Sequence, residues 1–208
     1  MKLLMSALLV GGLVATVFVQ SSDEVLRIYV VDVEGGNATL FISPSGESML
    51  MDTGNGGANA DRDVGRIMAA IEDAGLDRID HLVTTHWHGD HYGGLSELAT
   101  RIPIRHYIDH GPTVEDNERV QNYIAGDYRR LSDAARRTIV EPGDAIPFAG
   151  VHTQVMASAG AVLDTALPGG GATNPLPNLS AYAVGKAGIV RFIETLAMEV
   201  AEYSIDAN

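Results

Sequence analysis

The sequence predicts an α/β domain, in which strands and helices alternate through the middle of the chain. Short runs rich in β-branched residues recur over 26–51 and are separated by glycine and proline turns. Over 61–75 the apolar residues change to a helical period. The apolar run 79–83 then ends directly in a cluster of histidines. Since α/β folds usually place their chemistry at the carboxyl ends of strands, the same pattern predicts where a site lies.

Length and composition set limits on both fold and partners. The chain has 208 residues, which allows one domain with an appendage and a sizeable core. Its net charge of −13 disfavours strong binding to nucleic acid, which needs Lys and Arg against phosphate. It has no cysteine, so disulfides, thiolate ligands and a Cys nucleophile are excluded. A metal site must therefore use His, Asp and Glu.

The first 22 residues are typical of a targeting segment. Lys2 is the only charge before Asp23, and an almost entirely apolar run over 3–19 follows it. A positive head before an apolar run is typical of a secretory signal, and an uncleaved anchor is the alternative, because 17 residues is short for a membrane span. A buried first helix is the third interpretation. We expect export, as a periplasmic, secreted or membrane-anchored protein.

The segment after residue 23 is expected to open as a meander of three strands. The strands are predicted over 26–33, 38–42 and 48–51, with turns between them. Asp52 directly follows the third strand. Its carboxylate either orients a metal-bound histidine or caps a turn, and the sequence leaves both roles open.

A helix and a buried strand follow. Apolar residues at i, i+3, i+4 and i+7 predict one buried helical face over 61–75: Val64, Ile67, Met68 and Ile71. The run 79–83 is predicted to be a strand, and 93–100 a short helix behind it.

The strand over 79–83 leads into four residues that are common metal ligands: His86, His88, Asp90 and His91. Alternate side chains of an extended backbone share a face, so His86 and His88 are expected to converge on one ion. We expect Gly89 to let the chain turn, so that Asp90 and His91 approach a second ion. Imidazoles with a carboxylate suit zinc, and also iron or manganese. The alternative is a surface loop with ordinary hydrogen bonds.

The next strand is predicted over 104–111 and ends in Asp109 and His110. Neighbouring parallel strands end at the same edge of a sheet, so these two residues either approach the histidine cluster or form a solvated strand end.

The rest of the domain is expected to combine a helical region with two strands. Residues 114–137 are predicted to be helical, and 138–140 and 151–156 to be strands, with a structural role for His152. Two arginine pairs are interpreted as solvated helix faces: Arg129-Arg130 and Arg136-Arg137.

The character of the sequence changes after the glycine- and proline-rich stretch 168–177. Residues 178–208 resemble the YxxxK helix of short-chain dehydrogenases, in which the tyrosine is the general acid/base and the lysine lowers its pKa and holds the cofactor ribose. Tyr182 and Lys186 match these positions. The family's glycine-rich turn is missing, and so is its serine, because 169–171 is Gly-Gly-Gly. We expect 178–208 to be an amphipathic helix.

The histidine cluster resembles the HxHxDH signature of the metallo-β-lactamase superfamily. The likeness includes Met51-Asp52-Thr53-Gly54 and covers about 25–177, and it is nearest to the hydrolase domain of bacterial DNA-uptake channel proteins. It implies a domain over 23–177 that forms the first half of an αββα sandwich, before the C-terminal helix. Full members have a second half that supplies a third His, a bridging Asp and a last His. Here the likeness ends near Pro177, so the site is expected to be incomplete.

Three functional interpretations follow. The resemblance implies a metal-dependent hydrolase, with one or two Zn²⁺ or other divalent ions, acting on an ester, amide or phosphodiester, impaired by the missing half. In it His86, His88, Asp90 and His91 bind metal, and Asp90 also handles the proton. The alternatives are an NAD(P)-linked dehydrogenase fragment that uses Tyr182 and Lys186, and a non-catalytic remnant. We also expect self-association, because a half-sandwich leaves an apolar face uncovered.

Overall fold

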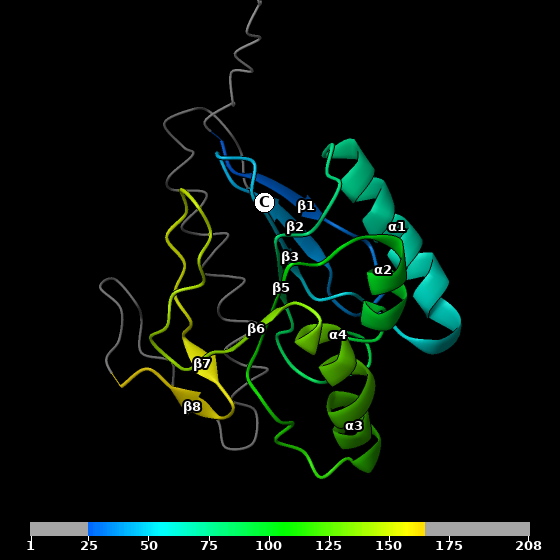
Figure 1. The fold of residues 1–208 in the computed structure, drawn as a ribbon, viewed down its shortest axis with the longest axis vertical. Coiled ribbons are helices and arrows are strands. Elements are labelled where there is room, and N and C mark those ends of the chain that lie inside the picture. The colour runs from blue at the N-terminus through cyan, green and yellow to red at the C-terminus, as the bar shows by residue number, and fades with distance from the viewer. Residues whose placement is uncertain (1–24, 165–208) are drawn as a thin grey trace, which may run out of the picture.

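The computed structural model describes residues 25–164 (Figure 1). The main sheet contains six strands: β1 (Arg27–Val30), β2 (Thr39–Ile42), β3 (Ser48–Met51), β4 (His81–Val83), β5 (His106–Asp109) and β6 (Arg136–Ile139). The α-helices in this part of the chain are α1 (Ala60–Asp73), α2 (Leu95–Arg101), α3 (Glu118–Tyr123) and α4 (Arg129–Asp133). A short 3₁₀ turn, η1 (Gly57–Asn59), precedes α1, and a π-helical turn, η2 (Ile124–Tyr128), joins α3 to α4.

The sheet order follows the chain order, β1-β2-β3-β4-β5-β6. Strands β1, β2 and β3 pair antiparallel, as the short turns between them require. Strands β3 to β6 pair parallel, and helices connect each strand to the next: α1 connects β3 to β4, α2 connects β4 to β5, and the segment from α3 to α4 connects β5 to β6. The mixed α/β architecture predicted from the sequence is confirmed, and the carboxyl ends of β3, β4 and β5 lie together at one edge of the sheet.

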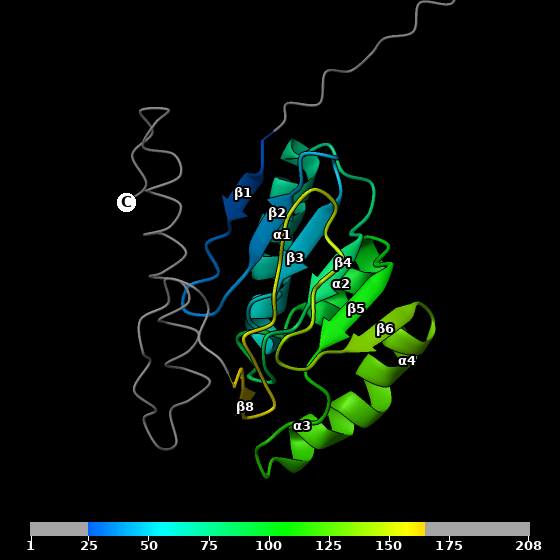
Figure 2. The same cartoon turned by 90° about the vertical axis from the view of Figure 1, so that its left-hand side faces the viewer.

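The four helices cover one face of the sheet (Figures 1 and 2). Val64, Ile67 and Ile71 of α1 are buried there against Leu50 and Leu82 of the sheet. The helical face predicted from the period of α1 is therefore confirmed. Burial of this apolar surface is the main term that stabilises the layer.

A smaller apolar cluster lies on the opposite face of the sheet. Residues 141–156 run across this face (Figure 2), and Phe148 packs there against Met49, Val83 and Ile108. The prediction of a strand over 151–156 is wrong, because these residues form no strand. This segment bonds within its own loop, from Thr153 Oγ1 to the carbonyl of Ile146 at 2.7 Å and from the Val155 N–H to the Asp144 carbonyl at 2.8 Å.

Strand pairing comes instead after this segment, in a small hairpin of β7 (Ala157–Ser158) and β8 (Ala161–Val162). His152, predicted to be structural, is exposed in the irregular segment before the hairpin.

The helical region after β5 ends earlier than the sequence predicts. The sequence predicts helix as far as residue 137, but α4 ends at Asp133 and β6 begins at Arg136. Arg137 is therefore not a solvated helix residue. Its guanidinium donates from Nε and Nη2 to the two carboxylate oxygens of the buried Asp109, at 2.8 and 2.9 Å. A buried carboxylate needs such a partner, and this pairing joins β6 to β5.

Two buried histidines, His81 of β4 and His106 of β5, contact each other, and the ring of His81 also packs against Phe148. Their Nδ1 atoms are 3.1 Å apart, while His81 Nε2 lies 3.1 Å from Glu47 and His106 Nε2 lies 2.8 Å from the Thr138 hydroxyl. Burial, with the charges of Arg136 and His81, lowers the pKa of His106 to about 4. His106 is thus neutral at pH 7, and the chain of hydrogen bonds from Glu47 to Thr138 is satisfied.

Two parts of the sequence interpretation lie outside the described residues. They are the targeting segment 1–22 and the C-terminal segment 178–208 with Tyr182 and Lys186. Among residues 25–164, no helix is both long enough and apolar enough to cross a bilayer.

Candidate metal centre

The histidine motif forms a loop at the carboxyl end of β4, beside the turn that follows β3. Backbone hydrogen bonds fix the two segments together: Asp52 N–H donates to the Val83 carbonyl at 2.8 Å, and Thr53 N–H donates to the His91 carbonyl at 2.6 Å. On the other side, Thr84 N–H donates to the Ile108 carbonyl of β5 at 2.9 Å. The loop is therefore held between the ends of three parallel strands.

Asp52 is the organising residue of this edge. Its side chain is buried, and its backbone has a φ of 61°, a conformation that Asp tolerates better than most residues. The carboxylate accepts hydrogen bonds from Asn37 Nδ2, from the Thr85 N–H and from the Thr85 hydroxyl, at 2.7–3.0 Å. It also contacts His91 Nδ1 at 2.7 Å. Of the two roles left open by the sequence, this geometry favours the orienting one.

Close backbone packing explains two glycines of the motif region. A Cβ at Gly93 would lie 2.1 Å from the Gly56 nitrogen and from the Gly89 carbonyl oxygen, and one at Gly94 would lie 2.3 Å from the Thr53 oxygen. Gly89, expected to allow the turn, has no such constraint: its φ lies outside the left-handed region, and a Cβ there would meet open space. The turn of the motif therefore does not depend on a glycine at position 89.

The three histidine rings of the motif lie against one another. The centroid of His86 is 3.9 Å from that of His91 and 4.4 Å from that of His88. Asp90 approaches the same group, with Oδ2 3.9 Å from His91 Nε2. All four residues predicted to be ligands are thus brought together at one place.

Each ring has one nitrogen engaged by a neighbouring oxygen. His86 Nδ1 lies 3.2 Å from the Thr85 hydroxyl, His91 Nδ1 lies 2.7 Å from Asp52, and His88 Nε2 lies 2.7 Å from Glu115 Oε1. The nitrogens that remain for a ligand are Nε2 of His86, Nδ1 of His88 and Nε2 of His91. Metal-binding histidines usually have their second nitrogen held in this way.

The surroundings of His86 and His91 shift the pKa values of these two rings in opposite directions. Burial, followed by the proximity of His91 and His88, lowers the pKa of His86 to about 4. Burial also acts to lower the pKa of His91, but the hydrogen bond and charge of Asp52, with the charge of Asp90, outweigh it and raise that pKa. His86 is therefore neutral at pH 7, the form that binds a metal.

The residues fit a divalent ion by type, although their donor atoms are not directed at one point. Three imidazoles and a carboxylate, with Asp52 behind one ring, are a donor set that zinc and similar ions accept. In the part of the chain from 25 to 164, however, no three His, Asp or Glu side chains are arranged to hold one ion as they stand. The three rings are nevertheless close together, and the engaged nitrogen of each ring contacts a different oxygen, so one nitrogen of each ring stays available for an ion.

The residues after β5 have other roles than those the sequence suggested. Asp109 neither joins the histidines nor forms a solvated end: it is buried and accepts from Arg137, from the Tyr128 hydroxyl at 2.6 Å and from the Gly111 N–H at 2.7 Å. His110 lies near Trp87, with ring centroids 6.1 Å apart and ring planes tilted by 59°, and its Nδ1 atom is buried without a hydrogen-bond partner in the described structure.

Trp87 attaches the histidine loop to the core of the domain. This residue lies between His86 and His88, is 3% exposed, and packs against Tyr128 and Tyr92. Its indole N–H donates to the Gly111 carbonyl at 2.8 Å, so the loop after β5 is tied to the histidine loop. Alternation then leaves the two flanking histidines on the side away from the core.

Glu115 is the contact that sequence reasoning missed. It lies 27 positions from His88 in a polar loop, and no motif includes it. The only available signal was that this loop follows β5, the strand next to the one that carries the motif.

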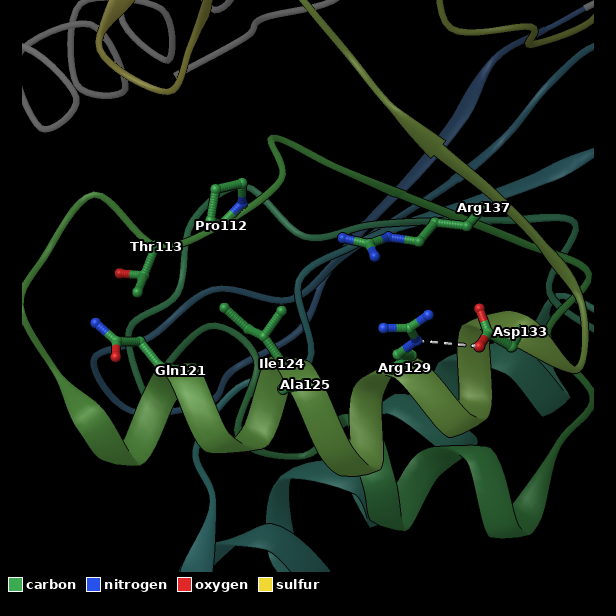
Figure 3. Close-up of a pocket in the computed structure, with 8 residues that line it drawn as sticks. All are labelled: Pro112, Thr113, Gln121, Ile124, Ala125, Arg129, Asp133 and Arg137. Carbon is green, nitrogen blue, oxygen red and sulfur yellow. Dashed lines mark hydrogen bonds and ion pairs between the residues drawn. The ribbon is translucent and has the colours of Figure 1, made fainter.

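A hollow on the helical side of β6 is separate from the histidines. It is lined by Pro112, Thr113, Gln121, Ile124, Ala125, Arg129, Asp133 and Arg137 (Figure 3). Arg129 and Asp133 form an ion pair across its wall at 3.4 Å. Since none of the motif residues lines this hollow, and its arginines are paired with carboxylates, we do not place the chemistry here.

Comparison with known proteins now identifies the family. Residues 31–174 match the family model described as the Metallo-beta-lactamase superfamily. The chain belongs to this superfamily. It is 28% identical to the lactamase-like protein aptB of Emericella nidulans over 125 residues, which are 56% of this chain and 38% of that protein. Members of this superfamily usually bind divalent metals.

Two other relatives have names that describe an activity. The chain is 30% identical to the thioesterase pkgB of Emericella nidulans, over 53% of this chain and 30% of that protein. It is 32% identical to a hydroxyacylglutathione hydrolase of Rhodopseudomonas palustris, over 47% of this chain and 31% of that protein. The chain thus spans about a third of the length of these curated relatives.

Solved structures of metallo-β-lactamases also resemble part of the chain. One is MEM-A1, a subclass B3 enzyme from a soil metagenome library, with 19% identity and a TM-score of 0.44, over 65% of this chain and 52% of that one. The likenesses to DNA-uptake channel proteins and to the short-chain dehydrogenase helix remain predictions.

Proposed function

We propose that this protein is a metal-dependent hydrolase whose ion or ions are held by His86, His88, Asp90 and His91. The observation that carries the proposal is the contact of the three rings, each with one nitrogen engaged and the other available. Zinc is the first ion to test, because imidazole nitrogens and carboxylate oxygens suit it.

The residues would divide the work as follows. His86 and His88, two positions apart, would hold one ion, while Asp90 and His91 would hold a second or complete the first. A bound divalent ion would polarise the substrate and lower the pKa of water. Asp90, whose carboxylate is partly exposed beside His91, is the group placed to hold and pass on the proton. Asp52 would keep His91 in the tautomer that leaves Nε2 free.

Acyl esters and thioesters are the substrate class we propose first. Relatives named as a thioesterase and as a hydroxyacylglutathione hydrolase favour it. The net charge of −13 argues against nucleic acids, because phosphate groups would be repelled. Small phosphodiesters and amides are the other substrates to include in a panel.

The test is metal analysis of the purified chain and of the double variant His86→Ala/His88→Ala. We expect the wild-type chain to retain about one or two equivalents of zinc, and the double variant to retain none and to lose thioester hydrolysis. His152→Ala is the matched control, because this histidine is exposed and lies outside the motif. Equal zinc in the wild type and the double variant would show that the ion is bound elsewhere.

A further inference from the structure

Glu115 and His88 form a close contact between two loops that are far apart in the sequence. Glu115 Oε1 lies 2.7 Å from His88 Nε2, and each side chain is about half exposed. The contact joins the loop after β5, residues 111–117, to the histidine loop after β4. Neither the superfamily motif nor any comparison assigns a role to this glutamate.

The loop that carries Glu115 is fixed at both ends, so the position of this residue is set by the fold. At its start, the Gly111 N–H donates to Asp109, and the Gly111 carbonyl accepts from Trp87 of the motif itself. At its end, Asn117 caps α3 by accepting from the Val120 N–H at 3.3 Å. Within the loop, the Glu115 N–H donates to the Thr113 hydroxyl, and the Asn117 N–H donates to the Glu115 carbonyl.

We propose that Glu115 is a positioning residue that selects the tautomer of His88 and thereby directs its Nδ1 atom toward the metal centre. A carboxylate has only acceptors, so the 2.7 Å contact requires the hydrogen of the neutral imidazole to be on Nε2. The lone pair is then on Nδ1, the nitrogen left on the ring beside His86. Glu115 thus does for His88 what Asp52 does for His91. This inference rests on the proposed function, since it concerns a ligand of the same site.

Two other roles for Glu115 make different predictions. If Glu115 forms only an exposed ion pair, it contributes little to stability, as is common for surface pairs, and neither substitution should change metal affinity. A direct metal ligand would need its negative charge, so replacement by Gln would be as harmful as replacement by Ala. An orienting acceptor needs only an oxygen in the right place, which Gln can still offer. Comparison of the two substitutions therefore separates the three roles.

The experiment uses the full chain and two measurements. The first is imidazole ¹H–¹⁵N NMR of the metal-free protein in mildly alkaline buffer, which reports the tautomer of each histidine, with His88→Asn to assign the signal. The second is a cobalt titration followed by visible absorption. The variants are Glu115→Ala and Glu115→Gln. The control is Asp116→Ala, an exposed neighbour for which the described structure gives no side-chain hydrogen bond or ion pair.

We expect His88 to carry its hydrogen on Nε2 in the wild type and in Glu115→Gln, and to become a mixture of tautomers in Glu115→Ala. Cobalt affinity should fall at least about tenfold in Glu115→Ala, as for other orienting partners of metal ligands, and stay close to wild type in Glu115→Gln and Asp116→Ala. Unchanged tautomer and affinity in Glu115→Ala would overturn the proposal, and so would an equal loss in both Glu115 variants.

Failure of the proposed function would look different from failure of this inference. If the wild-type chain binds no cobalt, the metal site is refuted, while the NMR comparison still decides whether Glu115 selects the tautomer of His88. If the wild type binds cobalt and Glu115→Ala binds it equally well, the metal site stands and the role of Glu115 is refuted.

Discussion

Gly93 packs so closely on the neighbouring turn that the position has no room for a side chain. The nearest atoms to an added Cβ are backbone atoms of Gly56 and Gly89, which cannot move as the end of a flexible side chain can. Gly93→Ala should therefore push the histidine loop away from the turn after β3. We expect a loss of about 1–3 kcal/mol in the free energy of unfolding, as for other overpacked sites, measured by urea denaturation.

Gly89→Ala is the matched control for this prediction. It lies in the same loop, but an added Cβ meets nothing within 4 Å. Its effect should remain within about 0.5 kcal/mol. If both variants lose the same stability, the close packing of Gly93 is not what holds the loop.

Single residues with an obvious chemistry were predictable, but not all of their partners were. The four motif residues and Asp52 stand next to strand ends in the sequence, and the fold gathers them because parallel strands end at one edge. Glu115 was missed because its role depends on how the loop 111–117 is anchored to Trp87 and α3. That anchoring is a tertiary effect with no local sequence pattern.

At the scale of elements, α1 and the buried strands were predicted because burial imposes a period on the sequence. The region after β5 was harder. A pair of arginines is compatible both with a solvated helix and with an edge strand, so the sequence predicts a helix that extends into β6. What decides the boundary is the buried carboxylate of Asp109, which takes Arg137 as its partner.

The pairing of Arg137 with Asp109 leads to a prediction about how β5 and β6 are held together. Arg137→Ala would leave a buried carboxylate with only the Tyr128 hydroxyl and the Gly111 N–H as partners. Removing one member of a buried ion pair typically costs about 3–5 kcal/mol, and we expect a loss of this size in thermal or denaturant unfolding. Arg136→Ala, at the exposed neighbouring position of the same strand, should cost less than about 0.5 kcal/mol. Equal effects would contradict the structural role of this pair.

At the scale of the whole molecule, the second face of the sheet is where sequence reasoning was least complete. The sequence predicts that this face lacks a cover, but Phe148 packs against its apolar centre. The segment 141–156 that carries Phe148 has no regular structure and hence no period to detect. Valines and isoleucines at the margins stay exposed, including Val30 and Ile139, so self-association remains a prediction to be checked by sizing.

Metal binding should be visible in the stability of the whole chain, because the histidine loop is bonded to the ends of β3 and β5 and an ion held there favours the folded state. Excess zinc at about 100 times its dissociation constant would add about 2.7 kcal/mol, provided that the unfolded chain does not bind it. For a chain of 208 residues this corresponds to a rise in Tm of about 5–10 °C. A chelator should reverse the rise, and His86→Ala/His88→Ala should show none, in scanning calorimetry at fixed protein concentration. A rise of the same size in the double variant would mean that zinc stabilises the protein from another site.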